Sequence, residues 1–187
     1  MAASLGYNQF TGAIPSTIGN LTNLTFLKLS NNQLTGGIPP EIGQLTNLTY
    51  LALWGNQFTG SIPSWIGQLT NLIRLYLYNN QLTGEIPEEI GNLTNLTYLS
   101  LAGNQLTSIP SEIGNLTNLE HLDFGYNQLS GEIPVEICNQ GDSTPSLSDN
   151  KLCPPYPSCL SETDIGAQNT SECAYCIANP TDPDCND

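Results

Sequence analysis

Apolar and polar positions recur along this 187-residue chain with a nearly constant period of 24 residues. An asparagine marks each period. It stands at positions 8, 32, 56, 80 and 104, always 24 residues apart, and then at positions 127 and 150, at steps of 23. A fixed period in this range is typical of stacked supersecondary units, each too small to bury a core alone. We therefore expect a solenoid.

The residues before each asparagine alternate between apolar and variable side chains, and this period of two predicts a short strand. The predicted strands are 27–29, 51–53, 75–77, 99–101 and 122–124. Stacked units would align these strands as a parallel sheet, with neighbouring strands roughly 4.8 Å apart. The leucines at both ends of each segment would point inward, and the residues between and beside them would point outward.

The remainder of each unit predicts a turn and a return segment. The repeating asparagine is expected to satisfy backbone groups where the chain leaves the strand, because its amide both donates and accepts. The Thr-Gly-x-Ile-Pro segments at 11–15, 35–39 and 59–63 predict a second extended stretch, and Thr17-Ile18-Gly19 predicts one helical or 3₁₀ turn ended by glycine. One residue is missing between Gln105 and Ile109, so we expect a local disturbance there with the next strand in register.

These residues resemble the plant-type leucine-rich repeat, whose consensus LxxLxxLxLxxNxLxGxIPxxIGxL is nearly matched by residues 21–45 and 45–69. The resemblance covers roughly residues 1–152. It implies an α/β solenoid: a right-handed coil with a concave parallel β-sheet, convex short strands with 3₁₀ or helical turns, and a disulfide-containing C-terminal cap. It also implies a binding role, as in receptor ectodomains and polygalacturonase-inhibitor-like proteins, and bacterial homologues carry similar repeats.

The chain divides into three predicted parts. Residues 1–137 are about six units of 23–24 residues, the first of them truncated; residues 138–160 are a last partial repeat and cap; residues 161–187 are an acidic, cysteine-containing tail. Met1 is not followed by a basic segment and an apolar stretch, so no signal peptide is recognised. Either a leader and a first cap preceded this segment or the protein lacks them.

All the cysteines fall in the last two parts, and their even number predicts disulfides and an oxidising compartment, which favours a secreted or cell-surface protein. They are Cys138, Cys153, Cys159, Cys173, Cys176 and Cys185. Cys138 and Cys159 fall at similar places on successive coils and are the expected pair. Reduced cysteines or a metal site are the alternative, but Cys173-x-x-Cys176 has zinc-ligand spacing without a second such motif.

The net charge and its distribution exclude some classes of binding partner. The net charge is −14, yet residues 1–84 contain a single acid, Glu41, against Lys28 and Arg74. Without a basic stripe the chain is not expected to bind nucleic acid or anionic membranes. It contains no run of 18 apolar residues, so this segment is not expected to insert into a membrane.

Candidate binding residues are the aromatic and charged residues at outward strand positions, because such side chains dominate interface hot spots. They are Phe26, Lys28, Tyr50, Trp54, Arg74, Tyr76, Tyr78, Tyr98, His121, Asp123 and Tyr126. The alternative is cross-strand stacking that only stabilises the sheet. A protein and a carbohydrate ligand both fit this pattern, since aromatic rings stack on sugars as well.

Two other functions remain open, and catalysis is not expected. Threonine and asparagine ladders at 22/46/70/94/117 and 23/47/71/95/118 are compatible with ice binding, which a few leucine-rich repeat proteins perform. A first coil without a cap would favour homo-oligomers formed end to end, as a structural or assembly module. His121 and Asp123 form a pair without a nucleophile, which argues against an enzyme. We expect neither cofactor nor metal, because the tail residues Asp182, Asp184, Asn186 and Asp187 lack EF-hand spacing.

Overall fold

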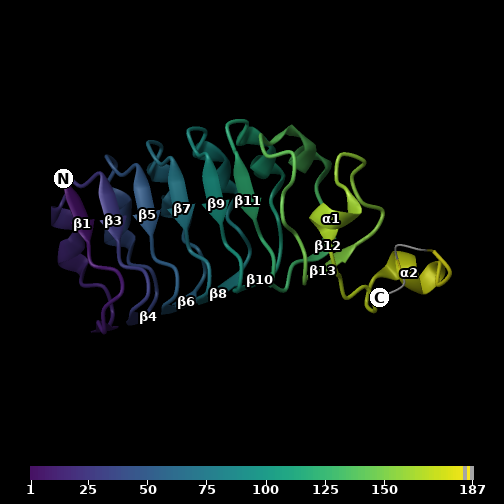
Figure 1. The fold of residues 1–187 in the computed structure, drawn as a ribbon, viewed down its shortest axis with the longest axis horizontal. Coiled ribbons are helices and arrows are strands. Elements are labelled where there is room, and N and C mark those ends of the chain that lie inside the picture. Colours follow the sequence, from purple (N-terminus) through teal and green to yellow (C-terminus); the bar gives the residue numbers. More distant parts are fainter. Residues whose placement is uncertain (183–184, 186–187) are drawn as a thin grey trace.

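The computed structural model describes residues 1–182 and residue 185. Of the acidic tail residues Asp182, Asp184, Asn186 and Asp187, which we do not expect to bind a metal, only Asp182 lies within the described residues. The repeats form one elongated solenoid, with the first coil at one end of the long axis and the segment that contains helix α2 at the other (Figure 1). Each 23–24-residue unit makes one coil, as the period predicts.

Short parallel strands line one side of the solenoid and form what we call the concave sheet (Figure 1). Its strands are β1 (Ala2–Ser4), β3 (Phe26–Lys28), β5 (Tyr50–Ala52), β7 (Arg74–Tyr76), β9 (Tyr98–Ser100) and β11 (His121–Asp123). The middle residue of each strand points inward, and Leu27, Leu51, Leu75 and Leu99 are completely buried. These leucines form the core because no single coil could bury them alone.

The return segments form a second parallel sheet. Its strands are β2 (Thr11–Gly12), β4 (Gln33–Gly36), β6 (Gln57–Gly60), β8 (Gln81–Gly84) and β10 (Gln105–Leu106). Gly36 and Gly60 end two of these strands with φ of +80° and +79°, a conformation that favours glycine. β10 is short because the coil that follows Asn104 lacks one residue and this glycine. β11 nevertheless pairs in register with β9, so the predicted local disturbance is confirmed.

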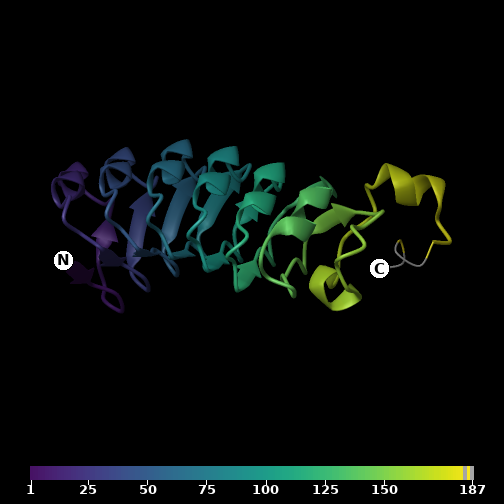
Figure 2. The same ribbon diagram turned by 90° about the horizontal axis from the view of Figure 1, so that it is seen from above.

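Between the two sheets each coil makes a five-residue 3₁₀ helix, and these helices stack along one side of the solenoid (Figure 2). They are η1 (Ser16–Asn20), η2 (Pro40–Gln44), η3 (Ser64–Gln68), η4 (Glu88–Asn92), η5 (Ser111–Asn115) and η6 (Val135–Asn139). A proline precedes each helix, and its fixed φ suits the extended N-cap position.

The prediction that glycine ends this turn is wrong. η3 continues through Gly67 to Gln68, and the residue that caps it is Leu69, with φ of −85°. Gly67 is required for a different reason: a Cβ there would lie 2.7 Å from both the Cβ and the carbonyl oxygen of Glu89 in the next coil. The glycine column therefore sets how closely successive helices stack.

The predicted asparagine ladder is confirmed. Asn56 donates its Nδ2 to the carbonyl oxygens of Leu53 and Leu29, at 2.9 and 3.0 Å, and its Oδ1 accepts the N–H of Leu34 at 3.1 Å. One amide thus closes its own turn and binds the preceding coil. Equivalent bonds recur at the other asparagines of the column, from Asn32 to Asn150.

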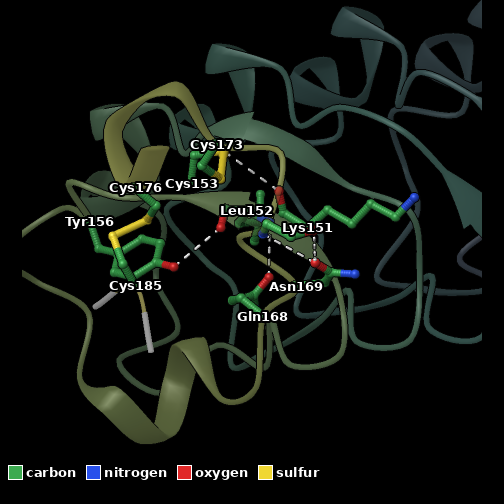
Figure 3. The surroundings of a disulfide bond; sticks show 10 residues. Lys151, Leu152, Cys153, Tyr156, Gln168, Asn169, Cys173, Cys176 and Cys185 are labelled. Carbon is green, nitrogen blue, oxygen red and sulfur yellow. Dashed lines mark hydrogen bonds between the residues drawn. A yellow bond between two sulfur atoms is a disulfide. The ribbon is translucent and has the colours of Figure 1, made fainter. Parts of the chain in front are cut away.

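The ladder continues one coil further than the asparagines do. Gln168 accepts the N–H of Leu152 at 3.0 Å (Figure 3). It also donates to the carbonyl oxygens of Leu147 and Ile165. Its longer side chain serves a coil only 18 residues after Asn150. Gln168 comes after the parallel strands β12 (Ser130–Glu132) and β13 (Lys151–Cys153) and the helix α1 (Glu162–Ile165).

All six cysteines lie within the described residues and form three disulfide bonds. Cys138 bonds to Cys159, the pair suggested by its position on successive coils. Cys153 bonds to Cys173, which ties β13 to the segment before helix α2 (Ala174–Ala178), and Cys176 bonds to Cys185 (Figure 3). The C-terminal end of the solenoid is thus covalently closed.

Candidate ligand-binding face

The register of the concave sheet sets its outward residues in two columns. The first runs Phe26, Tyr50, Arg74, Tyr98 and His121, each aligned with the next. The second runs Lys28, Ala52, Tyr76, Ser100 and Asp123. The period of two predicted these columns, because residues two apart on a strand share one face.

Rings from different coils stack across the face. Phe26 stacks on Tyr50 with centroids 4.2 Å apart, and Trp54 stacks on Tyr78 at 4.8 Å. Tyr76 lies between these two pairs, 5.6 Å from Tyr50 and 6.4 Å from Tyr78. The rings therefore form one connected group, which we call the aromatic platform. Each such pair contributes about 0.5–1.5 kcal/mol beyond its buried area.

The platform extends towards the C-terminal coils. Tyr98 lies 6.5 Å from Tyr76 and 5.7 Å from the ring of His121. Asp123, on the same strand as His121, accepts the N–H of Gly125 at 3.1 Å. His121 is exposed and Asp123 half-buried, so both can meet a ligand at this end of the face.

Tyr7 also belongs to the platform, although the sequence prediction did not include it. Its ring meets Trp54 edge-on at 5.8 Å, and the Nζ of Lys28 lies 4.8 Å from its centroid. The sequence could have indicated Tyr7, because it directly precedes Asn8 just as Tyr126 of the candidate set directly precedes the next ladder asparagine of its own coil.

Arg74 stands exposed in the middle of the platform, and its guanidinium lies 4.8 Å above the centre of the Tyr98 ring. Burial raises the pKa of the Tyr50 and Tyr76 hydroxyls, and the positive charge of Arg74 partly opposes that rise. Burial likewise raises the pKa of Tyr78. These hydroxyls therefore remain protonated at neutral pH and can donate hydrogen bonds.

Some outward positions of the sheet carry small side chains that neighbouring residues cover. Ser30, Ala52 and Ser100 are 0%, 0% and 5% exposed, although their strand positions face outward. These small residues occupy columns that otherwise carry the large rings and Lys28, so their neighbours cover them. The accessible residues of β3 to β9 are therefore mainly the large rings, Lys28 and Arg74.

The asparagine and threonine ladders of the return side are joined by hydrogen bonds. The Nδ2 of Asn47 donates to the carbonyl oxygen of Thr22 at 2.9 Å, and Asn71 bonds to Thr46 in the same way. The asparagine amides thus link successive coils, while the side chains of Thr22 and Thr46 remain exposed.

Within the part of the chain that the structure describes, no helix is long and apolar enough to cross a membrane.

The repeats match models of a known protein family. The family model described as a leucine-rich repeat region matches residues 6–100, and a model of two leucine-rich repeat copies matches residues 94–135. A comparison with curated protein sequences gives no match.

Solved structures of plant receptors share the fold. The ectodomain of GASSHO1/SCHENGEN3 from Arabidopsis thaliana, in complex with CASPARIAN STRIP INTEGRITY FACTOR 2, superposes with a TM-score of 0.79 and 41% identity over 81% of this chain. The Arabidopsis receptor kinase HAESA, in complex with the peptide hormone IDA and the co-receptor SERK1, gives a TM-score of 0.79 and 36% identity over 88% of this chain.

This chain spans different shares of the matched chains. This chain spans 18% of the GASSHO1/SCHENGEN3 chain and 28% of the HAESA chain. It spans 71% of a chain in the BIR3–SERK2 complex from Arabidopsis thaliana, with a TM-score of 0.60 and 34% identity over 83% of its own length. The 24-residue coils, the asparagine ladder and these matches together show that the chain belongs to the leucine-rich repeat family.

Proposed function

We propose that this chain is an extracellular binding module that captures a protein ligand, through an extended peptide segment, on its concave aromatic face. The observation that carries the proposal is the connected platform of rings around the exposed Arg74. Aromatic residues and arginine are the side chains that most often dominate binding energy at interfaces.

The arrangement of the rings supports binding beyond stabilisation of the sheet. Tyr50, Trp54, Tyr76, Tyr78 and Tyr98 are only partly buried, so each keeps surface that a ligand can cover. Mutual stacking already holds them in place, which lowers the conformational entropy lost on binding. Their hydroxyl and indole N–H groups can meet the backbone groups of a peptide.

Relatives of the same fold support this class of ligand. The HAESA structure contains a peptide hormone, and RGFR1 is a plant peptide hormone receptor solved with RGF2. Because this chain spans only 25% of the RGFR1 chain, the ligands of those receptors are a guide to chemistry rather than to identity.

The disulfides support the location. Three disulfide bonds persist only where the environment is oxidising, as in secreted and cell-surface proteins. The relatives named above include receptor ectodomains, which agrees with an extracellular role.

A triple variant tests the proposal. Trp54→Ala, Tyr76→Ala and Tyr98→Ala together remove three rings from the platform, while Val135→Ala truncates an exposed apolar residue on η6, away from the concave sheet. Peptides selected from a displayed random library against the wild type are then measured against all three proteins. We expect the triple variant to lose roughly tenfold or more in affinity and Val135→Ala to bind like the wild type.

Circular dichroism establishes that the triple variant is folded. Full binding by a folded triple variant would place the site elsewhere. Enrichment on a glycan array, without any enriched peptide, would replace the peptide with a carbohydrate ligand.

A further inference from the structure

The charges of this chain are sorted between its two sides. No acidic residue occurs in strands β1, β3, β5, β7 and β9 of the concave sheet, whereas Lys28 and Arg74 both lie there. The acids of the same coils lie on the return side: Glu41 in η2, Glu85 after β8, Glu88 and Glu89 in η4, and Glu112 in η5. The concave face is therefore locally cationic on a protein whose net charge is −14.

The side chain of Arg74 is exposed and accessible to an external partner. Its Cζ lies 4.8 Å from the centre of the Tyr98 ring, and its charge also acts on the hydroxyls of Tyr50 and Tyr76. A guanidinium held over a ring in this way keeps N–H groups along its edge, and these suit the paired oxygens of a carboxylate. Because no acid stands in its strand or in the strands on either side, such a carboxylate has to come from a ligand.

A ligand on the concave face is affected more by the charges on that face than by the net charge of the protein. The return side lies across the core of the solenoid, and packed layers are separated by roughly 10 Å. The Debye length at physiological ionic strength is about 8 Å, so the exposed acids there act more weakly on a ligand at the concave face than the charges on that face do. Lys28 and Arg74 stand on the face itself and act on a ligand directly.

We propose, on the basis of the proposed function, that the ligand is an acidic peptide and that Arg74 receives one of its carboxylates beside Tyr76 and Tyr98. Lys28, over the Tyr7 ring, attracts further acidic groups towards the N-terminal coils. Asp123 stands in β11, at the opposite end of the sheet, and repels them. The acidic part of the peptide therefore lies over β3 to β7 rather than over β11.

A displayed library of random peptides tests this inference. It is selected on the wild type and, in parallel, on Arg74→Gln, Arg74→Glu and Lys151→Gln. Lys151→Gln is the matched control, because it removes one positive charge from β13, outside the concave sheet. We expect peptides enriched on the wild type and on Lys151→Gln to be rich in aspartate and glutamate. That enrichment should fall on Arg74→Gln and change to lysine and arginine on Arg74→Glu.

Binding constants complete the test. An enriched acidic peptide should bind Arg74→Gln at least roughly tenfold more weakly, and its affinity for the wild type should fall with added salt. Enriched peptides with the charge of the input library, still dependent on Trp54, would overturn the acidic ligand and leave the proposed function standing. Peptides that depend on neither Arg74 nor Trp54, or no enrichment at all, would overturn both.

Discussion

The side chain of Asn56 accepts the backbone N–H of Leu34 from the preceding coil at 3.1 Å, and so joins two neighbouring repeats. The same amide donates to Leu29 and Leu53, and the residue is only 9% exposed. The stability of the solenoid depends on such contacts between neighbours, because each repeat packs only against the next.

Asn56→Ala should therefore destabilise the protein by about 1–3 kcal/mol, since the buried N–H of Leu34 loses its partner. The carbonyl groups of Leu29 and Leu53 each lose one of two donors and keep the Nδ2 groups of Asn32 and Asn80. Urea denaturation followed by circular dichroism measures the loss. Gln57→Ala, which changes the exposed residue beside it, should stay within about 0.5 kcal/mol of the wild type. Equal stability of the two variants would show that water replaces the ladder.

Close stacking of the 3₁₀ helices gives a second prediction. A Cβ on Gly91 would lie 2.6 Å from both the Cβ and the carbonyl oxygen of Glu112, so Gly91→Ala must push two coils apart. We expect a loss of about 1–3 kcal/mol, again from urea denaturation. Gly37→Ala is the control, because the nearest atom to its Cβ would be 3.9 Å away. A wild-type midpoint for Gly91→Ala would contradict the stacking role.

The glycine column illustrates what the sequence could and could not predict. The period, the inward leucines and the asparagine ladder follow from spacing alone, because every coil repeats one geometry. Glycine fits both a helix end and a close contact, and only the position of Glu89 against Gly67 decides between them. Gln168 was missed because it extends the ladder at a different spacing and with a longer side chain.

The sequence predicted which residues of the candidate site share a column, but it did not predict which side chains touch. Alternation placed Arg74 and Tyr76 on one face, whereas the way that side chains lean across coils decides which rings meet. Tyr7 contacts Trp54, two coils further along, and the alternation of residues along a strand does not predict such a contact. Similarly, Ser30 occupies an outward position, yet it is completely buried.

Three partly buried tyrosines predict a free energy of unfolding that falls in alkaline solution. Burial raises the pKa of Tyr50, Tyr76 and Tyr78 above the ordinary value of 10.0, although Arg74 partly opposes this for Tyr50 and Tyr76. Above that value the folded state binds more protons than the unfolded state, so the free energy of unfolding decreases as pH rises. The contribution is complete below pH 10 and is lost as pH rises through the folded-state pKa values.

Thermal melts at about pH 9 and about pH 11 measure this effect. We expect the melting temperature of the wild type to fall between the two, and a triple variant, Tyr50→Phe, Tyr76→Phe and Tyr78→Phe, to fall less. Tyr126→Phe, which removes a hydroxyl outside the platform, should behave like the wild type. The same decrease in all three proteins would assign the alkaline loss to other groups.

Tyr126 predicts a conflict between stability and binding. Its φ is +55°, in the left-handed region, and the equivalent positions of other coils carry Tyr7, Asn31, Gly55, Asn79, Gly103 and Asp149. A bulky side chain is costly in that conformation, and the ring of Tyr126 is 66% exposed, so burial offsets little of the cost. Retaining a tyrosine there is consistent with a contact to the ligand at the C-terminal end of the concave face.

Tyr126→Asn should raise the free energy of unfolding by about 1 kcal/mol and at the same time weaken the binding of peptides selected on the wild type. Denaturation and affinity measurements on the same preparation test both parts. The reverse change, Asn79→Tyr, should destabilise the protein by a similar amount, because it places an aromatic residue at φ of +54°. If Tyr126→Asn lowers stability instead, the ring supports the fold, and its strained backbone is no sign of a ligand contact.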